Sequence, residues 1–182
     1  EYGFIAQTLY ERGKLQPGMK GLGFAVGREP LPALFASYGC EIVATDLDCT
    51  ADPTTQSLWV ATGQHASDVR HLNERGICPE NEFAKRVQFR PADMNNVPSN
   101  LRDFDFVWSS CAIEHVGSLE LSARAVCSMM NWLKPGGIAV HTTEFNVSSN
   151  RRTYEVGESV IWRRRDLSSL VGHLEKEGHR VV

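Results

Sequence analysis

An acid and a histidine stand side by side near the middle of the chain, directly after a run of small residues. They are Glu114 and His115, in the stretch FDFVWSSCAIEHVGS that begins at Phe104. An imidazole can take a proton from a hydroxyl or an amine, and a neighbouring carboxylate can orient the ring or bind the substrate. We therefore predict His115 as a catalytic base and Glu114 as its partner. The alternative is that His115 is a hydrogen-bonded structural residue.

A second histidine and acid, His141 and Glu144, close a later apolar run. Residues three apart on a strand point to opposite faces, so these two are not expected to act together. His141 also suits a core position in which a neighbouring group satisfies the ring. A metal site built from these two residues with Glu114 and His115 would lack any established ligand spacing such as H-E-x-x-H. We expect no metal.

The stretch GLGFAVGREPLPALFASYGCEIVATD, from Gly21 to Asp46, has the form of a ligand-binding turn between two strands. Its glycines do not follow the G-x-G-x-x-G spacing of a dinucleotide site. Gly27 lets the backbone pass close to a ligand, and the N–H groups of 28–31 are expected to be free for a carboxylate or phosphate. Glu29 would repel a pyrophosphate but accept a zwitterion or a cation. A plain structural turn is the alternative.

These residues depend for their positions on an alternation of strands and helices. Apolar runs bounded by turn residues predict strands, and apolar residues at helical spacing predict helices. The expected strands are 19–24, 41–46, 86–91, 104–110 and 138–145, with the beginning of a sixth at 179–182. The expected helices are 4–15, 30–38, 67–75, 119–133 and 167–177, the last two capped by Ser118 and Asp166. The rest of 47–81 is expected to be irregular.

Strands that alternate with helices imply right-handed crossovers and a parallel sheet with helices on both faces. We therefore predict an α/β three-layer sandwich with a mostly parallel, doubly wound sheet. A single domain is expected over 1–182, with the last strands of the sheet missing. In such a sheet the ligand binds at the carboxyl ends of the strands. The candidate loops are 25–29, 46–48, 92–94, 109–115 and 141–146.

The composition argues against several classes of function. A net charge of −3 provides no basic field for nucleic acid, and no apolar run approaches the roughly 20 residues of a membrane span. Neither nucleic acid nor membrane is expected as a partner. The five cysteines include no C-x-x-C pair, which suits free thiols and a cytoplasmic location. The three arginines at 163–165 are interpreted as a solvated face rather than a phosphate clamp.

Two further motifs carry a resemblance to a known family. After the strand FDFV come small residues, the pair EH, a helix, the motif LKPGG and a fifth strand, in that order. This order resembles class I S-adenosylmethionine-dependent methyltransferases. The resemblance covers 17–145 in detail and, more weakly, the helix at 166–177. It implies a Rossmann-like fold, S-adenosyl-L-methionine as the cofactor and methyl transfer as the activity.

The resemblance implies cofactor-binding roles for the residues after the first two strands. Ala25, Val26 and Gly27 would line the methionine part of the cofactor. Asp46, nineteen residues after Gly27, would accept the ribose hydroxyls, and Leu47 would pack on the adenine.

It implies further roles for the residues after the third and fourth strands. Asp93 and Met94 would address the amine and the face of the adenine, whereas Ser109 and Ser110 would lie under the sulfonium. The alternative for the first pair is that Asp93 starts a turn and Met94 belongs to the core.

The first motif departs from the family pattern. An acid commonly precedes the glycines, but Gly23 stands near that place, and Ala25 and Glu29 occupy positions where a tighter loop carries glycines. An alanine suits this loop if its φ is negative.

The predicted function is transfer of a methyl group to an oxygen or nitrogen of a polar small molecule or a sugar. The polar stretch 57–76, which contains Trp59, would suit such an acceptor. One alternative is a noncatalytic module that keeps the fold for binding or regulation. The other is an NAD-dependent oxidoreductase, which the irregular glycines and Glu29 disfavour.

Overall fold

A single parallel sheet runs through the protein, and its order follows from where the chain crosses over. The computed structural model describes residues 1–47, 63–96 and 101–182. Within them five strands pair in the order β3-β2-β1-β4-β5, and all neighbouring strands of this sheet are parallel. The strands are β1 (Lys20–Phe24), β2 (Glu41–Asp46), β3 (Val87–Pro91), β4 (Phe104–Ser110) and β5 (Leu133–Thr142). The order reverses between β1 and β4, where a doubly wound sheet binds its ligand.

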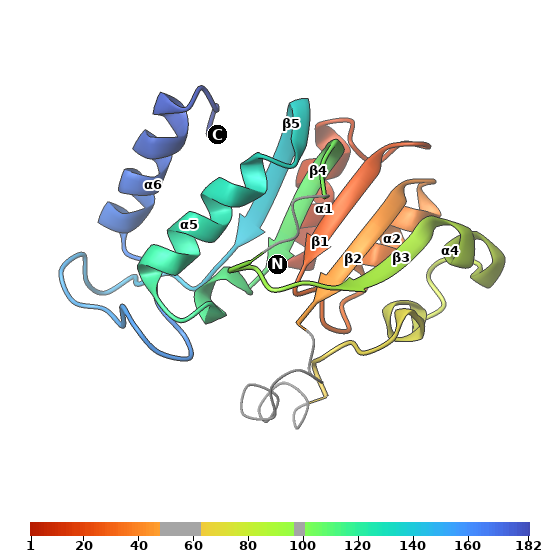
Figure 1. Cartoon of the computed structure of the whole chain (residues 1–182), viewed down its shortest axis with the longest axis horizontal. Helices are drawn as coiled ribbons and strands as arrows, with labels where there is room; N and C mark the ends of the chain where they lie inside the picture. Colours follow the sequence, from red (N-terminus) through yellow and green to blue (C-terminus); the bar gives the residue numbers. More distant parts are fainter. Residues whose placement is uncertain (48–62, 97–100) are drawn as a thin grey trace.

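Helices cover both faces of the sheet, as Figure 1 shows. One face carries α1 (Tyr2–Glu11), α2 (Leu31–Ser37) and α4 (Glu80–Arg86), and the other carries α5 (Leu119–Met130) with α6 (Arg164–Lys176) beside it. Two short 3-10 helices, η1 (Val69–Asn73) and η2 (Ile113–His115), lie in the connections. The predicted α/β three-layer sandwich with a doubly wound parallel sheet is therefore confirmed.

Two glycines in β1 allow large rings to lie against the backbone of the strand. Phe106 and Trp108 of β4 pack on the same face as Gly21 and Gly23, because both strands alternate with a period of two. A Cβ atom added at Gly23 would lie 2.3 Å from Cζ2 of Trp108. The ring of Phe35 from α2 meets Trp108 edge-on, with centroids 5.0 Å apart. Gly23 therefore serves close packing between β1 and β4.

Most of the predicted elements are present, and several boundaries are confirmed. Strands β2 and β4 have the predicted bounds, and β1 and β3 differ from them by one residue. Ser118 caps α5, because its side chain accepts a hydrogen bond from the amide of Leu121 at 3.1 Å. Helix α6 begins two residues before Asp166, whose carboxylate accepts from the Arg163 amide as the third helical residue rather than as the cap.

Four expectations were wrong. Helix α4 was not expected, and 67–75 forms only the short η1. Strand β5 begins at Leu133 instead of Ile138, since the LKPGG motif pairs with β4 through a register shift between Phe104 and Phe106. Residues 179–182 form no strand, so the predicted sixth strand is absent from this part of the chain.

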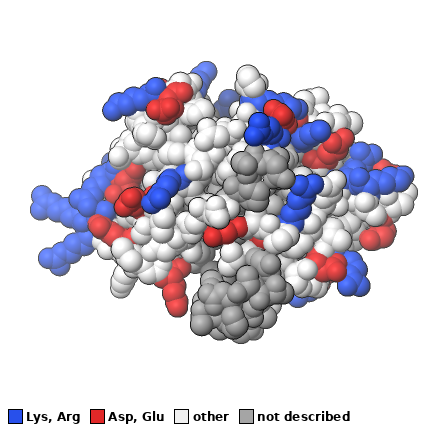
Figure 2. Space-filling model, in the orientation of Figure 1, with Lys and Arg blue, Asp and Glu red and all other residues white. Residues whose placement is uncertain are grey.

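Arg163 does not belong to a solvated arginine face. Its side chain is buried and donates from Nε to Asp166 at 2.6 Å, while Nη1 lies 2.7 Å from Glu155. It therefore fixes the start of α6 to the preceding loop. Figure 2 shows Lys and Arg side chains gathered near that loop, with acidic side chains among them. The exposed arginines of this region are Arg151, Arg152, Arg164 and Arg165.

The cysteines agree with the expectation of free thiols. Four cysteines are free thiols, namely Cys40, Cys78, Cys111 and Cys127, whereas Cys49 lies outside the described residues. Over the described ranges, none of the helices combines the length and the apolar character that a membrane crossing requires.

Replacing Gly23 by alanine should destabilise the protein. The added methyl group would overlap the buried Trp108 ring, and overpacking of this kind typically costs about 1–3 kcal/mol. Urea denaturation of the two proteins measures the difference in unfolding free energy. Gly172→Ala is the matched control, because Gly172 lies inside α6 and an added Cβ meets nothing within 4 Å. The control should gain up to about 1 kcal/mol, and a Gly23→Ala protein as stable as the unmodified chain would contradict this account.

Candidate active site

The Asp46 carboxylate holds together three segments at the carboxyl edge of the sheet. Its Oδ2 accepts hydrogen bonds from the amides of Gly27 at 3.1 Å and Ala66 at 3.2 Å, and its Oδ1 accepts from Leu47 at 2.8 Å. The residue is buried, and desolvation raises its pKa although the three amides lower it. A carboxylate offers about four lone-pair positions. One of them, on Oδ1, is left for a ligand.

The turn after β1 is tighter than the sequence suggests. Ala25 has φ +46°, so the expectation of a negative φ was wrong, and Gly27 has φ +51°. A Cβ at Gly27 would lie 2.6 Å from the carbonyl oxygen of Gln64, which shows why glycine is needed there. Val26 is buried beneath the turn. A left-handed alanine is strained, and such strain is common at functional sites.

The predicted anion seat on the backbone amides of 28–31 was wrong. The amide of Arg28 donates to the carbonyl of Gln64 at 3.0 Å, and the amide of Glu29 donates to Val26 at 3.1 Å. Pro30 has no amide hydrogen, and α2 is only 7 residues long. The segment after β2 therefore occupies the amide of Arg28, and the turn itself occupies the amide of Glu29.

The predicted adenine residues occupy the ends of β2 and β3. Leu47 is half-buried, and its carbonyl is bound by Nε2 of His65 at 2.9 Å. Asp93 is exposed and starts a turn, because its Oδ1 accepts from the amide of Asn95 at 2.8 Å, and Met94 packs partly against the core. The turn suggested as the alternative for Asp93 is present. The contact of these residues with an adenine stays a prediction.

The two serines that end β4 differ in environment. Ser109 is fully buried, and its hydroxyl lies 2.8 Å from Nδ1 of His141. Burial lowers the pKa of His141 to about 4, so its ring is neutral. The core-histidine alternative is met only in part, because Nε2 has no hydrogen-bond partner among the described residues. Ser110 is half-buried, and its hydroxyl has no partner among the described residues. Of the predicted pair, only Ser110 is left as a candidate contact for the sulfonium.

The chain positions His115 through a segment far away in sequence. Nδ1 of His115 lies 2.8 Å from the carbonyl oxygen of Glu158. A carbonyl can only accept, so Nδ1 carries the hydrogen of this contact. A backbone carbonyl therefore bonds Nδ1 of this ring, and the orienting role of Glu114 stays a prediction.

Glu114 is instead a buried carboxyl between β4 and β5. Its Oε2 accepts from the hydroxyl of Thr143 at 3.0 Å, and Oε1 has no hydrogen-bond partner in the described part of the chain. Burial raises its pKa, partly offset by Thr143 and by the neighbouring His115. This position suits the other predicted role of Glu114, which is to bind the acceptor.

A cysteine and two acids gather at this place, which the sequence did not indicate. Ligand atoms of Cys111, Glu114 and Glu144 lie within 4.8 Å of one another, and neither His115 nor His141 belongs to the group. Cys111 has φ +43°, and burial raises the pKa of its thiol to about 12. Only the strained backbone after β4 brings the thiol to this edge, and no spacing motif signals that conformation.

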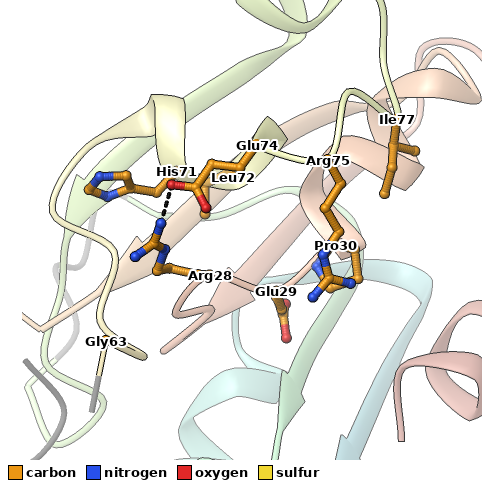
Figure 3. A pocket seen from close by; sticks show the side chains of 9 residues that line it. All are labelled: Arg28, Glu29, Pro30, Gly63, His71, Leu72, Glu74, Arg75 and Ile77. Carbon is orange, nitrogen blue, oxygen red and sulfur yellow. Dashed lines mark hydrogen bonds and ion pairs between the residues drawn. The ribbon is translucent and has the colours of Figure 1, made fainter.

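Glu29 is the third buried carboxyl of the site. It is 5% exposed, and its Oε1 accepts from the indole of Trp108 at 2.6 Å. Burial raises its pKa to about 8, the indole hydrogen bond lowers it, and the nearby Asp46 raises it. Glu29 and the ion pair of Arg28 with Glu74 line a pocket of about 190 Å³ between α2 and η1 (Figure 3).

Comparison with known families identifies the domain. Residues 22–141 match a family model described as a methyltransferase domain, which is well over half of the chain. The chain belongs to the methyltransferase domain family. The matched region contains every predicted cofactor residue and both predicted catalytic residues. No curated protein sequence matches this methyltransferase domain.

Three solved structures show how widely the fold of the methyltransferase domain is shared. The 4+2 cyclase SpnF has a TM-score of 0.61 at 18% identity, over 93% of this chain and 56% of its own. The magnesium protoporphyrin IX methyltransferase ChlM from Synechocystis PCC 6803 with bound SAH has a TM-score of 0.58 at 10% identity, over 94% of this chain and 70% of its own. The glycopeptide N-methyltransferase MtfA complexed with sinefungin has a TM-score of 0.56 at 16% identity, over 84% of this chain and 53% of its own. The chain spans about half the length of the first solved structures that it matches.

Glu29→Gln should change how the stability of the methyltransferase domain depends on pH. The pKa of Glu29 is about 8 in the fold against 4.5 ordinarily, so the folded state holds this proton more tightly. The contribution of this proton to the free energy of unfolding is fully present below the ordinary pKa and is lost as pH rises through about 8. Glutamine cannot titrate. The stability difference between the two proteins should therefore change by on the order of 5 kcal/mol over that window, measured by urea denaturation at several pH values.

Glu74→Gln is the control for this measurement. Glu74 lines the same pocket, but its side chain is 44% exposed. The control should follow the pH profile of the unmodified protein. A Glu29→Gln profile parallel to that of the unmodified protein would show that Glu29 is already ionised in the fold.

Proposed function

We propose that this methyltransferase domain uses S-adenosylmethionine to methylate an oxygen or nitrogen of a polar small molecule or a sugar. The cofactor would lie along the carboxyl ends of β1, β2 and β3, and the acceptor would lie beside η2 and the end of β5. The observation that carries the proposal is the Asp46 carboxylate. It is buried at the end of β2, bonded to the Gly27 turn, and still able to accept on Oδ1.

The residues present suit a cofactor that carries a positive charge. Three buried carboxyl groups, those of Glu29, Asp46 and Glu114, lie just beyond strands of this edge. Burial raises the pKa of each of them. A nearby cation favours the charged form of a buried carboxyl. A sulfonium and these acids would therefore stabilise one another.

Two oxygen atoms are left for the acceptor side of the site. The hydroxyl of Ser110 and Oε1 of Glu114 are buried and lack hydrogen-bond partners among the described residues. Buried polar atoms are normally satisfied, so unsatisfied ones at a strand edge suit a polar ligand. This supports an acceptor rich in hydroxyl or amine groups. Trp59, which was predicted to help cover it, lies outside the described residues.

The chemistry asked of the chain is positioning and removal of one proton. When bound, S-adenosylmethionine supplies a methyl group on a neutral leaving group. Glu114 would hold the acceptor hydroxyl or amine, and the imidazole of His115 would receive the proton that the acceptor loses. Holding the acceptor in line with the methyl group accounts for most of the rate. A cytoplasmic location is part of the proposal and is supported by the free cysteines.

A noncatalytic binding or regulatory module is the second candidate. The fold alone does not decide between the two, since the 4+2 cyclase SpnF, named for a reaction other than methyl transfer, shares it. A fold does not determine its chemistry. Methyl transfer therefore has to be tested directly, with cofactor binding as a separate measurement.

Asp46→Asn should weaken the binding of S-adenosylhomocysteine by at least about tenfold, since the ribose hydroxyls would lose a charged acceptor. Isothermal titration calorimetry measures the affinity, with NAD as a ligand that should not bind. Asp103→Asn is the control, because Asp103 is exposed at the opposite end of β4 and its φ of +67° is tolerated by asparagine. Unchanged affinity in Asp46→Asn would place the ribose elsewhere.

His115→Ala should lower turnover by about 10²–10⁴ without changing the affinity for S-adenosylhomocysteine, because a base acts on the acceptor and not on the cofactor. The acceptor is first found by screening sugars, amino sugars and other polar amines with methyl-labelled S-adenosylmethionine. His173→Ala, on the exposed side of α6, is the control and should keep full turnover. Full turnover in His115→Ala would show that the proton leaves by another route.

A further inference from the structure

Glu29 stands where a glycine would make the turn tighter, and its carboxyl group is held in one orientation. The indole N–H of Trp108 donates to Oε1 at 2.6 Å, across 79 positions of sequence. The side chain points away from the ion pair of Arg28 with Glu74 (Figure 3). The carboxyl group therefore faces β4 and the interior edge of the site rather than the neighbouring pocket.

The indole is itself immobilised. Trp108 is fully buried, its ring covers the backbone of Gly23, and Phe35 packs edge-on against it at 5.0 Å. A side chain at Gly23 would displace this ring. The glycine at the end of β1 and the acid at position 29 are therefore linked, because the first allows the indole that anchors the second.

The other oxygen of Glu29 is left over. In the described part of the chain nothing donates a hydrogen bond to Oε2. The charged and titratable groups around the carboxyl are Asp46 at the end of β2 and Tyr2 of α1, whose pKa is raised by burial and then by Glu29. No cation of the described residues acts directly on Glu29.

We infer that Glu29 binds the α-ammonium group of the amino-acid end of S-adenosylmethionine through Oε2. This inference rests on the proposed function, and it assigns to position 29 the acidic contact for which Gly23 has no side chain. An ammonium donates to the unpartnered oxygen and supplies the positive charge that the buried carboxyl and Asp46 lack. The same carboxyl disfavours a pyrophosphate, so Glu29 also selects against dinucleotides.

Glutamine at position 29 separates this role from a structural one. Its amide oxygen can still accept from the Trp108 indole, so the packing is kept while the charge is lost. Isothermal titration calorimetry should show that Glu29→Gln binds S-adenosylhomocysteine at least about tenfold more weakly. The affinity for 5′-methylthioadenosine, which lacks the amino-acid end, should be unchanged and also shows that the variant is folded.

Glu74→Gln, which alters the exposed acid of the neighbouring pocket, should bind both ligands as the unmodified protein does. If Glu29→Gln binds both ligands normally, or loses the same factor for both, the inference is overturned while the proposed function stands. If the unmodified protein binds neither ligand, the proposed function is overturned and the inference falls with it.

Discussion

The close approach of the Trp108 ring to the backbone of Gly23 is the contact on which the site depends. The strands β1 and β4 pair at the point where the strand order reverses. Because Gly23 has no side chain, the ring of Trp108 from β4 can lie over the face of β1. This contact also fixes the indole N–H that holds Glu29. The pairing of a large residue on β4 with a glycine on β1 thus determines both the packing of the core and the position of a charged group at the carboxyl edge of the sheet.

Backbone groups, as well as side chains, hold together the segments at the carboxyl edge of the sheet. Asp46 bonds amides from three segments, and the carbonyl of Glu114 accepts from Val160 while Nδ1 of His115 bonds Glu158. The cofactor half of the site is therefore assembled by a carboxylate, and the acceptor half by a later segment docked on η2. Because these ties lie within the protein, ligand binding need not order them first.

Local signals in the sequence predicted the sheet, and distant contacts explain what it did not predict. The apolar runs of β2 and β4 and the Ser118 cap depend on neighbouring residues, so their positions are readable. Helix α4 was missed because Pro79 and the charged pair of Glu82 with Arg86 resemble a polar loop. The positive φ of Ala25 belongs to a turn whose next residues, Gly27 and Arg28, meet Gln64 from the distant segment after β2. No local pattern shows that Glu29 meets Trp108, since these residues are 79 positions apart.

Burial of acids at this edge is itself an argument about ligand charge. Removing a carboxyl from water is costly, and the side-chain donors that the fold offers are neutral: an indole for Glu29, and a hydroxyl and a thiol for Glu114. A domain that needed only stability would be served equally well by apolar side chains at such positions. Carboxyl groups kept at raised pKa beside strand ends are instead typical of sites where a cation arrives. The protein thus holds two acids in an unfavourable state that a positively charged cofactor would relieve, which links the packing of the core to the choice of ligand.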